Sequence, residues 1–368
     1  MATVNVWPLE SGVRPGAGPR LVTEPAVAKE AKAPAPKISV IIVTWNVRDL
    51  TLQCLRVLRD RVGAIPLEVI VVDNASDDGT ADAVRLAFPE AVVIANEENV
   101  GFPRANNQAL QVATGEYVLF LNPDTSVGEG TLDACVAELD RDASVGMVGC
   151  RLLYENGDVQ LECARRPYLL RHLLTETLYL HMIFPRHPVF GHHLMGDWDH
   201  TGTRDVEAIC GAFMMVRREV AQRLGGLPED LFMYHEDLSF CLRLRRAGWI
   251  IRYLGDVTTT HYWRRSSGRS YTPLDLLEGE HKLLLIRESQ GTIAAAIGRG
   301  VFVVRSVIRL AIAGAGSALP ERAGLRDRYP RVFDARRHAL QLAWGVAPKA
   351  VYRFFHRSGN GASTLSAG

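Results

Sequence analysis

Two apolar stretches that end in acidic and amide side chains decide the fold: Val69-Ile-Val-Val-Asp73-Asn-Ala-Ser-Asp77-Asp-Gly-Thr80 and Tyr117-Val-Leu-Phe-Leu-Asn122-Pro-Asp124. Continuous aliphatic runs are typical of parallel strands that are buried on both faces. Ligands of open α/β sheets bind beyond the carboxyl ends of such strands. The pattern therefore predicts an α/β nucleotide site, in which Asp73 and Asp77 take a base and ribose while Asp124 holds a metal against a diphosphate.

The hydrophobic period indicates strands that alternate with helices. Strands are expected at 38–43, in a run that ends at 73, and at 91–95, 116–121 and 145–153, with helices at 48–61, 79–87, 103–113 and 129–140. This alternation predicts a mostly parallel sheet with right-handed crossovers. The second half is less regular. A helix at 168–181, a strand at 210–216 and a helix at 236–248 are expected around a stretch without a period at 182–205, where long loops are often lids or binding loops.

Five short motifs occur in a fixed order along the chain. They are Val-Val-Asp73-Asn-Ala-Ser76-Asp77-Asp-Gly79, Asn99-Val-Gly101-Phe-Pro-Arg104-Ala-Asn-Asn107, Leu121-Asn-Pro-Asp124, Gly211-Ala-Phe-Met, and Glu236-Asp237 followed by Arg243 and Gly248-Trp249. Over about residues 37 to 290 the set resembles the inverting glycosyltransferases of family 2, which have the GT-A fold. The subgroup that it resembles most is the bacterial rhamnosyltransferases of surface polysaccharide synthesis. Each motif alone is weakly specific, whereas five in the expected order are strong evidence.

The resemblance implies a nucleotide and metal site. Asp73 would recognise the base, and the expected nucleotide-binding set is Thr44, Asn46, Asp73, Asn74, Ser76, Asp77, Asn99, Gly101, Arg104 and Asn122. Asp124 corresponds to the last carboxylate of the metal-binding Asp-x-Asp motif, whose first position is Asn122 in this chain. His261 matches a position where relatives supply a further ligand. One carboxylate and one imidazole suit manganese at least as well as magnesium.

The resemblance also implies the reaction. An acceptor hydroxyl attacks the anomeric carbon of a nucleoside diphosphate sugar with inversion, and a divalent cation neutralises the charge that grows on the leaving diphosphate. The donor is expected to be linked to dTDP or UDP, with rhamnose from dTDP-rhamnose as the preferred interpretation, and the acceptor to be a polysaccharide or a lipid-linked glycan. Asp237 is the expected base and Glu236 the competing one. The residues expected around donor and acceptor are Gly211, Ala212, Phe213, Trp263, Arg264 and Arg265.

Each assignment has a structural alternative. Asp73 and Asp77 also suit turn or N-cap positions, Asp237 suits the first turn of a helix, and His261 suits a packed strand. Two other functions stay open. A nucleotidyltransferase that makes the nucleotide sugar would need a Gly-rich triphosphate loop, where Thr44-Trp-Asn-Val stands instead. A non-catalytic sugar-nucleotide binding protein is disfavoured by the intact acidic and histidine positions.

Composition predicts the organisation around this core. Residues 1–36, rich in Pro, Ala and Gly, are expected to form a disordered arm. The catalytic domain is expected at 37–290, with a nucleotide-sugar half at 37–125 and an acceptor half at 126–290, followed by a basic helical extension at 291–368. A net charge of +1 gives no field that favours nucleic acid. Six separately placed cysteines indicate reduced, buried thiols, and the first residues lack the pattern of a secretory signal, so a cytoplasmic location is expected.

The expected extension is locally basic. Residues 299–337 contain nine arginines and three acidic residues, and the segment 301–310 has a helical pattern. An amphipathic basic helix is typical of a segment that lies on an anionic membrane surface, here the inner face of the cytoplasmic membrane. Packing of this helix on the catalytic domain or in a homodimer is an equally good interpretation.

Overall fold

The computed structural model describes residues 35–61, 65–262 and 271–317. Almost all of the expected arm at 1–36 and the extension beyond 317 lie outside these ranges. Trp263, Arg264 and Arg265 of the expected pocket also lie outside the described residues.

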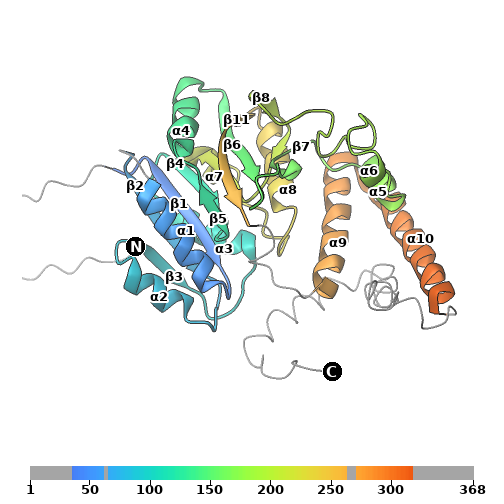
Figure 1. Ribbon diagram of the computed structural model, residues 1–368, viewed down its shortest axis with the longest axis horizontal. Coiled ribbons are helices and arrows are strands. Elements are labelled where there is room, and N and C mark those ends of the chain that lie inside the picture. Colours follow the sequence, from blue (N-terminus) through green and yellow to red (C-terminus); the bar gives the residue numbers. More distant parts are fainter. Residues whose placement is uncertain (1–34, 62–64, 263–270, 318–368) are drawn as a thin grey trace, which may run out of the picture. The chain divides into compact units, whose positions relative to one another are not determined.

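A mixed sheet organises the described chain (Figure 1), with the strand order β3-β2-β1-β4-β10-β6-β11-β5 and β8 paired to β11. Its strands are β1 (Ile38–Thr44), β2 (Leu67–Asp73), β3 (Val92–Ala95), β4 (Tyr117–Leu121), β5 (Thr125–Val127), β6 (Val145–Leu153), β8 (Thr203–Val206), β10 (Phe213–Arg217) and β11 (Ile250–His261). Strands β3, β2, β1 and β4 are parallel, whereas β10 is antiparallel to both β4 and β6. The mostly parallel α/β sheet predicted from the sequence is confirmed.

Helices pack against this sheet as the alternation predicted. They are α1 (Arg48–Arg61), α2 (Thr80–Ala87), α3 (Phe102–Val112), α4 (Thr131–Arg141), α7 (Arg218–Arg223) and α8 (Glu236–Arg246). Helix α3 contacts β1 and β2, and α4 contacts β6. Strand β1 is buried along its whole length, which explains why all of its apolar positions are aliphatic.

The irregular second half differs from the prediction in its details. The helix expected at 168–181 is divided into α5 (Leu170–Thr177) and α6 (Leu180–Ile183), because Tyr179 between them has a left-handed backbone with φ of 57°. Strand β10 begins at Phe213 rather than at 210. A small sheet of β7 (Ala164–Arg165) and β9 (Ala208–Ile209), and a single 3₁₀ turn η1 (Leu161–Cys163), lie between the larger elements and have no periodic signal in the sequence.

Two long helices complete the described chain: α9 (Tyr271–Gln290) and α10 (Thr292–Ser317), which contains the predicted helical segment. Helix α10 packs on α9 and α5. Gly298 allows this close approach, since a Cβ atom there would lie 3.0 Å from Leu283 Cδ2 and 3.4 Å from Leu173 Cδ2. Phe302, one turn further, is also buried. One side of α10 is therefore a packing face.

The cysteines are free, as predicted. Five of them are buried and Cys210 is partly buried. Burial raises the pKa of the Cys54, Cys150 and Cys241 thiols to about 12. None of the helices in the described ranges has both the length and the apolar character needed to cross a bilayer.

Candidate active site

The carboxyl ends of β1, β2 and β4 bring the predicted nucleotide-binding residues to one edge of the sheet. Thr44 pairs in register with Asp73, and Ile42 of β1 pairs with Leu121 of β4. Asn74 and Asn122 directly follow the ends of β2 and β4, and the Asn74 N–H donates to the Thr44 carbonyl at 2.9 Å. This is the sheet edge at which α/β proteins bind ligands.

An amide network holds the edge beyond β2. Asn74 Nδ2 donates to Asn99 Oδ1 at 2.8 Å, and Asn74 Oδ1 accepts from the backbone N–H of Val100 at 3.0 Å. Asn99 Oδ1 also accepts from the Gly101 N–H at 3.0 Å. Gly101 has φ of 88°, and a Cβ atom there would lie 2.8 Å from the carbonyl oxygen of Phe232. The motif around Asn99 therefore holds the loop before α3 in place, through contacts with Asn74 after β2 and with Phe232 before α8.

The acidic turn after β2 is held by its own side chains. Asp73 is buried and accepts from the Ser76 N–H at 3.3 Å and from the Ser76 hydroxyl. Burial raises the pKa of Asp73, although the Ser76 hydrogen bonds partly oppose the shift. Asn46 Oδ1 accepts from the Asp77 N–H at 2.9 Å and so ties the turn to the end of β1. The Asp77 side chain is exposed.

Asp124 and His261 meet where β4 and β11 end. His261 Nε2 lies 3.4 Å from Asp124 Oδ1 and 3.4 Å from Asn122 Nδ2. Two ligands of one octahedral ion, with bonds of about 2.1 Å, lie roughly 3 Å apart, so the two side chains fit a shared divalent cation. Within the described ranges no group of three or more His, Cys, Asp or Glu side chains forms a metal site. Among the described residues, Asp124 and His261 are thus the side chains that could hold a cation at this point, together with oxygens from a bound ligand.

Gln160 orients His261 from the segment between β6 and η1. Its side chain is fully buried, and its Oε1 accepts from His261 Nδ1 at 2.9 Å. Its Nε2 donates to the His261 carbonyl at 2.6 Å and to the Leu153 carbonyl at 3.2 Å. Because Nδ1 carries the proton in this arrangement, Nε2 keeps its lone pair toward Asp124. Metal-ligating histidines commonly have such a partner on their other nitrogen.

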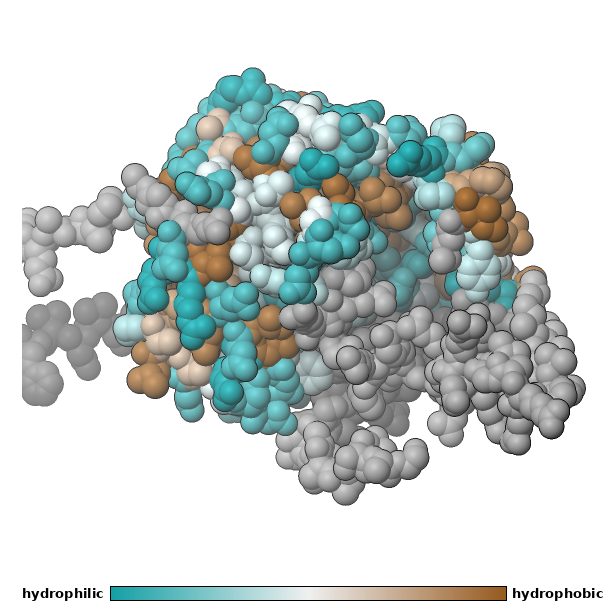
Figure 2. Space-filling view, viewed as in Figure 1, coloured by the Kyte–Doolittle hydropathy of each residue, from teal (hydrophilic) through white to brown (hydrophobic). Residues whose placement is uncertain are grey.

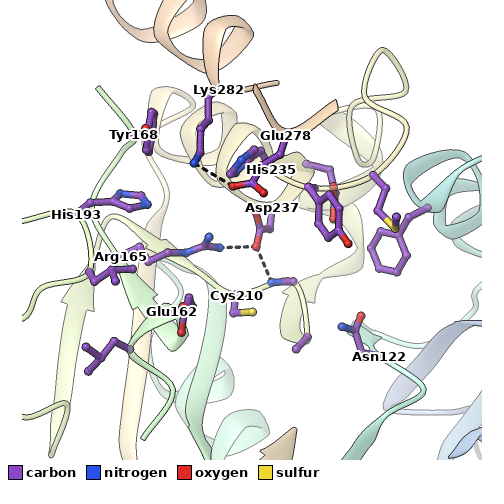
Figure 3. Close-up of a pocket in the computed structure, with 18 of the residues that line it drawn as sticks. Asn122, Glu162, Arg165, Tyr168, His193, Cys210, His235, Asp237, Glu278 and Lys282 are labelled. Atoms are coloured by element: carbon purple, nitrogen blue, oxygen red, sulfur yellow. Dashed lines mark hydrogen bonds and ion pairs between the residues drawn. The ribbon is translucent and has the colours of Figure 1, made fainter. Parts of the chain in front are cut away.

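Glu236 and Asp237 form a buried carboxyl pair at the start of α8. Asp237 Oδ2 accepts from Arg165 and from the Gly211 N–H at 2.8 Å (Figure 3). Its Oδ1 accepts from the Leu238 N–H at 2.7 Å. Burial alone would raise the pKa of Asp237, but the charge of Arg165 and the Gly211 hydrogen bond lower it. Asp237 is consequently ionised at neutral pH. A carboxylate has about four acceptor positions, so three donors leave one for a ligand.

Glu236 has the opposite electrostatic character. Burial and the adjacent charge of Asp237 raise its pKa to about 8. Its Oε2 has no hydrogen-bond partner among the described residues. Two residues with left-handed backbones, Tyr234 with φ of 71° and His235 with φ of 69°, precede it and turn the start of α8 toward the sheet edge. Strained conformations of this kind are found preferentially at functional sites.

These groups surround one cavity of about 600 Å³. Figure 3 shows Asn122 on one side of it, Asp237 with Arg165 in the middle, and the ion pair of Lys282 and Glu278 on the far side. The predicted site residues that line the cavity are Thr44, Asn74, Asn99, Asn122, Gly211, Ala212, Glu236, Asp237 and His261. The outer part is formed by Thr175 of α5, Lys282 of α9, and residues of the segments around α5 and α6, which are Tyr168, Tyr179, Phe190 and His193.

The structure does not bring every predicted site residue to the cavity. Arg104 is exposed on α3 and forms an ion pair with Glu229 at 3.3 Å, and Phe213 is a buried residue of β10. Asp124 lies just beneath the lining, against His261. The other predicted residues that are absent from the lining are Asn46, Asp73, Ser76, Asp77 and Gly101. Of these, Gly101 is hydrogen-bonded to the lining side chains of Asn74 and Asn99.

Two polar residues of the site have no signal in the sequence. Arg165 lies in the two-residue strand β7 and Gln160 in an irregular segment, so neither is marked by periodicity or by a motif. Both are placed by contacts with residues more than 70 positions away. Only the observation that buried carboxylates need cationic partners could have predicted an arginine beside Asp237.

The sequence model of Glycosyl transferase family 2 matches residues 39–225, which is more than half of the chain, and the chain therefore belongs to this family. It is 27% identical over 228 residues to the N-acetylglucosaminyl-diphospho-decaprenol L-rhamnosyltransferase of Mycobacterium tuberculosis, which covers 59% of this chain and 73% of that protein. It is 29% identical over 219 residues to the O-antigen biosynthesis protein RfbC of Myxococcus xanthus, which covers 58% of this chain and 16% of that protein.

The fold is also similar to a solved structure of GalNAc-T7 with UDP, GalNAc and Mn2+. The TM-score is 0.51 at 13% identity, and the match covers 88% of this chain and 59% of that one. The GT-A fold that the sequence resemblance implied is confirmed.

Proposed function

We propose that this glycosyltransferase transfers a sugar with inversion from a nucleoside diphosphate donor to a hydroxyl of a glycan, in a metal-dependent reaction. The observation that carries the proposal is the cavity itself. It places an ionised, buried carboxylate, Asp237, in the same space as the Asn122–His261 edge, where a diphosphate and its cation would bind. A donor on the sheet side and an acceptor on the outer side would meet at Asp237.

The proposed roles follow from these contacts. Asp73, Asn74 and Asn99 hold the nucleotide edge, while Asp124 and His261 would hold Mg²⁺ or Mn²⁺. When bound, the cation supplies charge neutralisation at the departing diphosphate. Asp237 takes the proton of the acceptor hydroxyl, since it is ionised and keeps one acceptor position. Arg165 and Gly211 hold that carboxylate in place.

The proposed donor is dTDP-rhamnose, with UDP sugars as the alternative, and the proposed acceptor is a polysaccharide or lipid-linked glycan of the cell surface. Support comes from the printed name of the mycobacterial relative, an N-acetylglucosaminyl-diphospho-decaprenol L-rhamnosyltransferase, and from that of the O-antigen biosynthesis protein. The outer part of the cavity includes the aromatic side chains of Tyr168, Tyr179 and Phe190, which suit an acceptor with apolar groups.

Release of nucleoside diphosphate from a panel of dTDP, UDP and GDP sugars, with and without Mn²⁺, tests the proposal. We expect one dTDP or UDP sugar to be turned over, and turnover to stop in excess chelator. Asp237→Asn should lower kcat by about 10²- to 10⁴-fold, the range for a lost general base, and change donor affinity only a few fold. Glu236→Gln is the matched control. Near-normal turnover by Asp237→Asn, or full activity in chelator, would contradict the assigned roles.

A further inference from the structure

An apolar surface lies on the outside of the helices that close the cavity. We define the α5–α10 face as Leu174, Leu178, Tyr179, Ile183, Phe184, Val189, Ile293, Ile297 and Val304, all of them exposed. Ile293 has 78% of its surface exposed, and Leu178 and Ile183 have 61% each. Figure 2 shows hydrophobic side chains gathered at the side of the molecule where Figure 1 places α5, α6 and α10. Several large apolar side chains on adjacent helices form an interaction patch rather than isolated exposures.

The exposed residues of α10 form a second face of that helix. Ile293, Ile297 and Val304 are separated by four and seven residues, so they lie on one stripe. Gly298 and Phe302 lie on the other side and pack on α9 and α5. The stripe therefore adds nothing to the internal packing of the described chain. Helix α10 packs directly on α5, and Figure 2 shows hydrophobic side chains gathered where Figure 1 places these two helices.

The charges around the α5–α10 face are positive. Residues 170–190 contain Arg171 and Arg186 and a single acidic residue, Glu176. Glu176 is turned inward, where it accepts from Lys282 at 2.9 Å and from Tyr168 at 2.8 Å. Both arginines are exposed, and in the described part of the chain neither forms a salt bridge. On α10, Arg299 is paired with Glu280 of α9 at 3.1 Å and Arg305 lines the cavity, so Arg171 and Arg186 supply the positive charge beside the face. An apolar patch with a basic rim is complementary to an anionic lipid surface.

The face is continuous with the cavity. Tyr179 is exposed on the face and also lines the cavity, and Pro185 and Phe190, on either side of Val189, line it as well. The same short segment therefore has one side toward solvent and one toward the outer part of the active site. A molecule held at the face would lie beside the cavity.

We propose that the α5–α10 face docks on an anionic lipid bilayer and lies on its surface, with the outer side of the cavity toward the lipid. The sequence suggested membrane contact for the basic extension after 291, as one of two interpretations. The contact surface proposed from the structure also includes α5, α6 and residues 183–189. This interaction goes beyond the proposed reaction and does not depend on which sugar is transferred. Each docked side chain removes apolar surface from water, and each arginine near the anionic headgroups adds electrostatic attraction to the bilayer.

Co-sedimentation of the full chain with vesicles of phosphatidylcholine, with and without phosphatidylglycerol, tests the proposal. The wild type should sediment with the anionic vesicles and should be released by salt. Ile183→Ser with Phe184→Ser, and separately Ile293→Ser with Ile297→Ser, should weaken the partition about tenfold or more, as expected when large buried apolar groups are removed. Arg171→Glu with Arg186→Glu should weaken it and reduce its salt dependence. Leu86→Ser, at a residue of α2 that is 88% exposed, is the matched control and should bind as the wild type does.

Any of three results would overturn the proposal. The first is equal sedimentation of the wild type and the face variants, and the second is that the wild type does not sediment with the anionic vesicles. The third is a wild-type dimer in light scattering that the same variants turn into monomers without any vesicle binding, which would assign the face to a second copy of the chain. Nucleotide binding, measured by calorimetry on every variant, should be unchanged. Loss of vesicle binding with intact nucleotide binding separates this surface from the active site, so either proposal can fail alone.

Discussion

His261 is controlled by a residue that no motif contains. Gln160 binds both the ring and the backbone carbonyl of His261 at 2.9 and 2.6 Å, so one buried side chain sets the tautomer and the position of the strand end. The resemblance to family 2 implied that His261, the last residue of β11, is a metal ligand. It could not indicate Gln160, because an amide in an irregular segment is usually a solvated residue.

We predict that Gln160→Leu weakens Mn²⁺ binding by about 10- to 100-fold, the range for loss of a partner that orients a metal-ligating histidine. The affinity for free nucleotide without metal should stay nearly constant. Titration of Mn²⁺ by electron paramagnetic resonance measures the first quantity and calorimetry the second. Gln222→Leu, at an exposed position of α7, is the control. Unchanged Mn²⁺ affinity in Gln160→Leu would exclude the orienting role.

At the scale of elements, the sequence predicted what local patterns determine. The continuous aliphatic runs of β1, β2 and β4 and the apolar period of α1 and α4 gave boundaries within a few residues of the observed ones. Strands β5, β7, β8 and β9 contain two to four residues, too few to show a period. The antiparallel position of β10 depends on pairing with residues far away in the chain. Tyr179 separates α5 from α6 through its left-handed backbone, and tyrosine is not a residue type from which that conformation is predicted.

Two glycine variants test how tightly the loop between β3 and α3 is packed. Gly101 has φ of 88° and ψ of 161°, a conformation that is essentially restricted to glycine, and a Cβ atom there would lie 2.8 Å from the Phe232 carbonyl oxygen. Gly79 has an ordinary left-handed backbone with φ of 77° and ψ of 21°, and a Cβ atom there would meet nothing within 4 Å. We expect Gly79→Ala to lower the free energy of unfolding by about 1 kcal/mol and Gly101→Ala by at least about twice that amount. Urea unfolding of both variants measures the difference. Equal losses would show that neither the backbone conformation of Gly101 nor the contact with Phe232 adds a cost.

At the scale of the whole molecule, the buried carboxyl pair couples stability to pH. The pKa of Glu236 is raised to about 8, so between its ordinary value near 4.5 and that value the folded state binds more protons than the unfolded state. Stability contributed by this group is thus present at low pH and lost as pH rises through the window. Asp237, with its lowered pKa, stays ionised throughout and keeps Arg165 paired.

We predict that Glu236→Gln removes the loss of folding stability that the wild type shows as pH rises. The free energy of unfolding of the variant, relative to the wild type, should increase from pH 5 to pH 8, with a limiting slope of about 1.4 kcal/mol per pH unit. Denaturant unfolding at several pH values measures it. Glu229→Gln, whose side chain is 45% exposed, controls for the removal of one negative charge. A difference that stays constant across this range would show that Glu236 titrates normally.

The five buried sulfur atoms have a consequence for how the molecule reacts with oxidants over time. Only a thiolate reacts readily with oxidants or alkylating reagents. Burial raises the pKa of thiols such as those of Cys54 and Cys150 and also denies reagents access to the five buried cysteines, whereas Cys210 is partly buried and lines the cavity. Chemical damage at the buried cysteines must therefore begin in the rare moments when part of the chain opens. The rate of modification at each buried cysteine then reports how often the region around that cysteine unfolds locally.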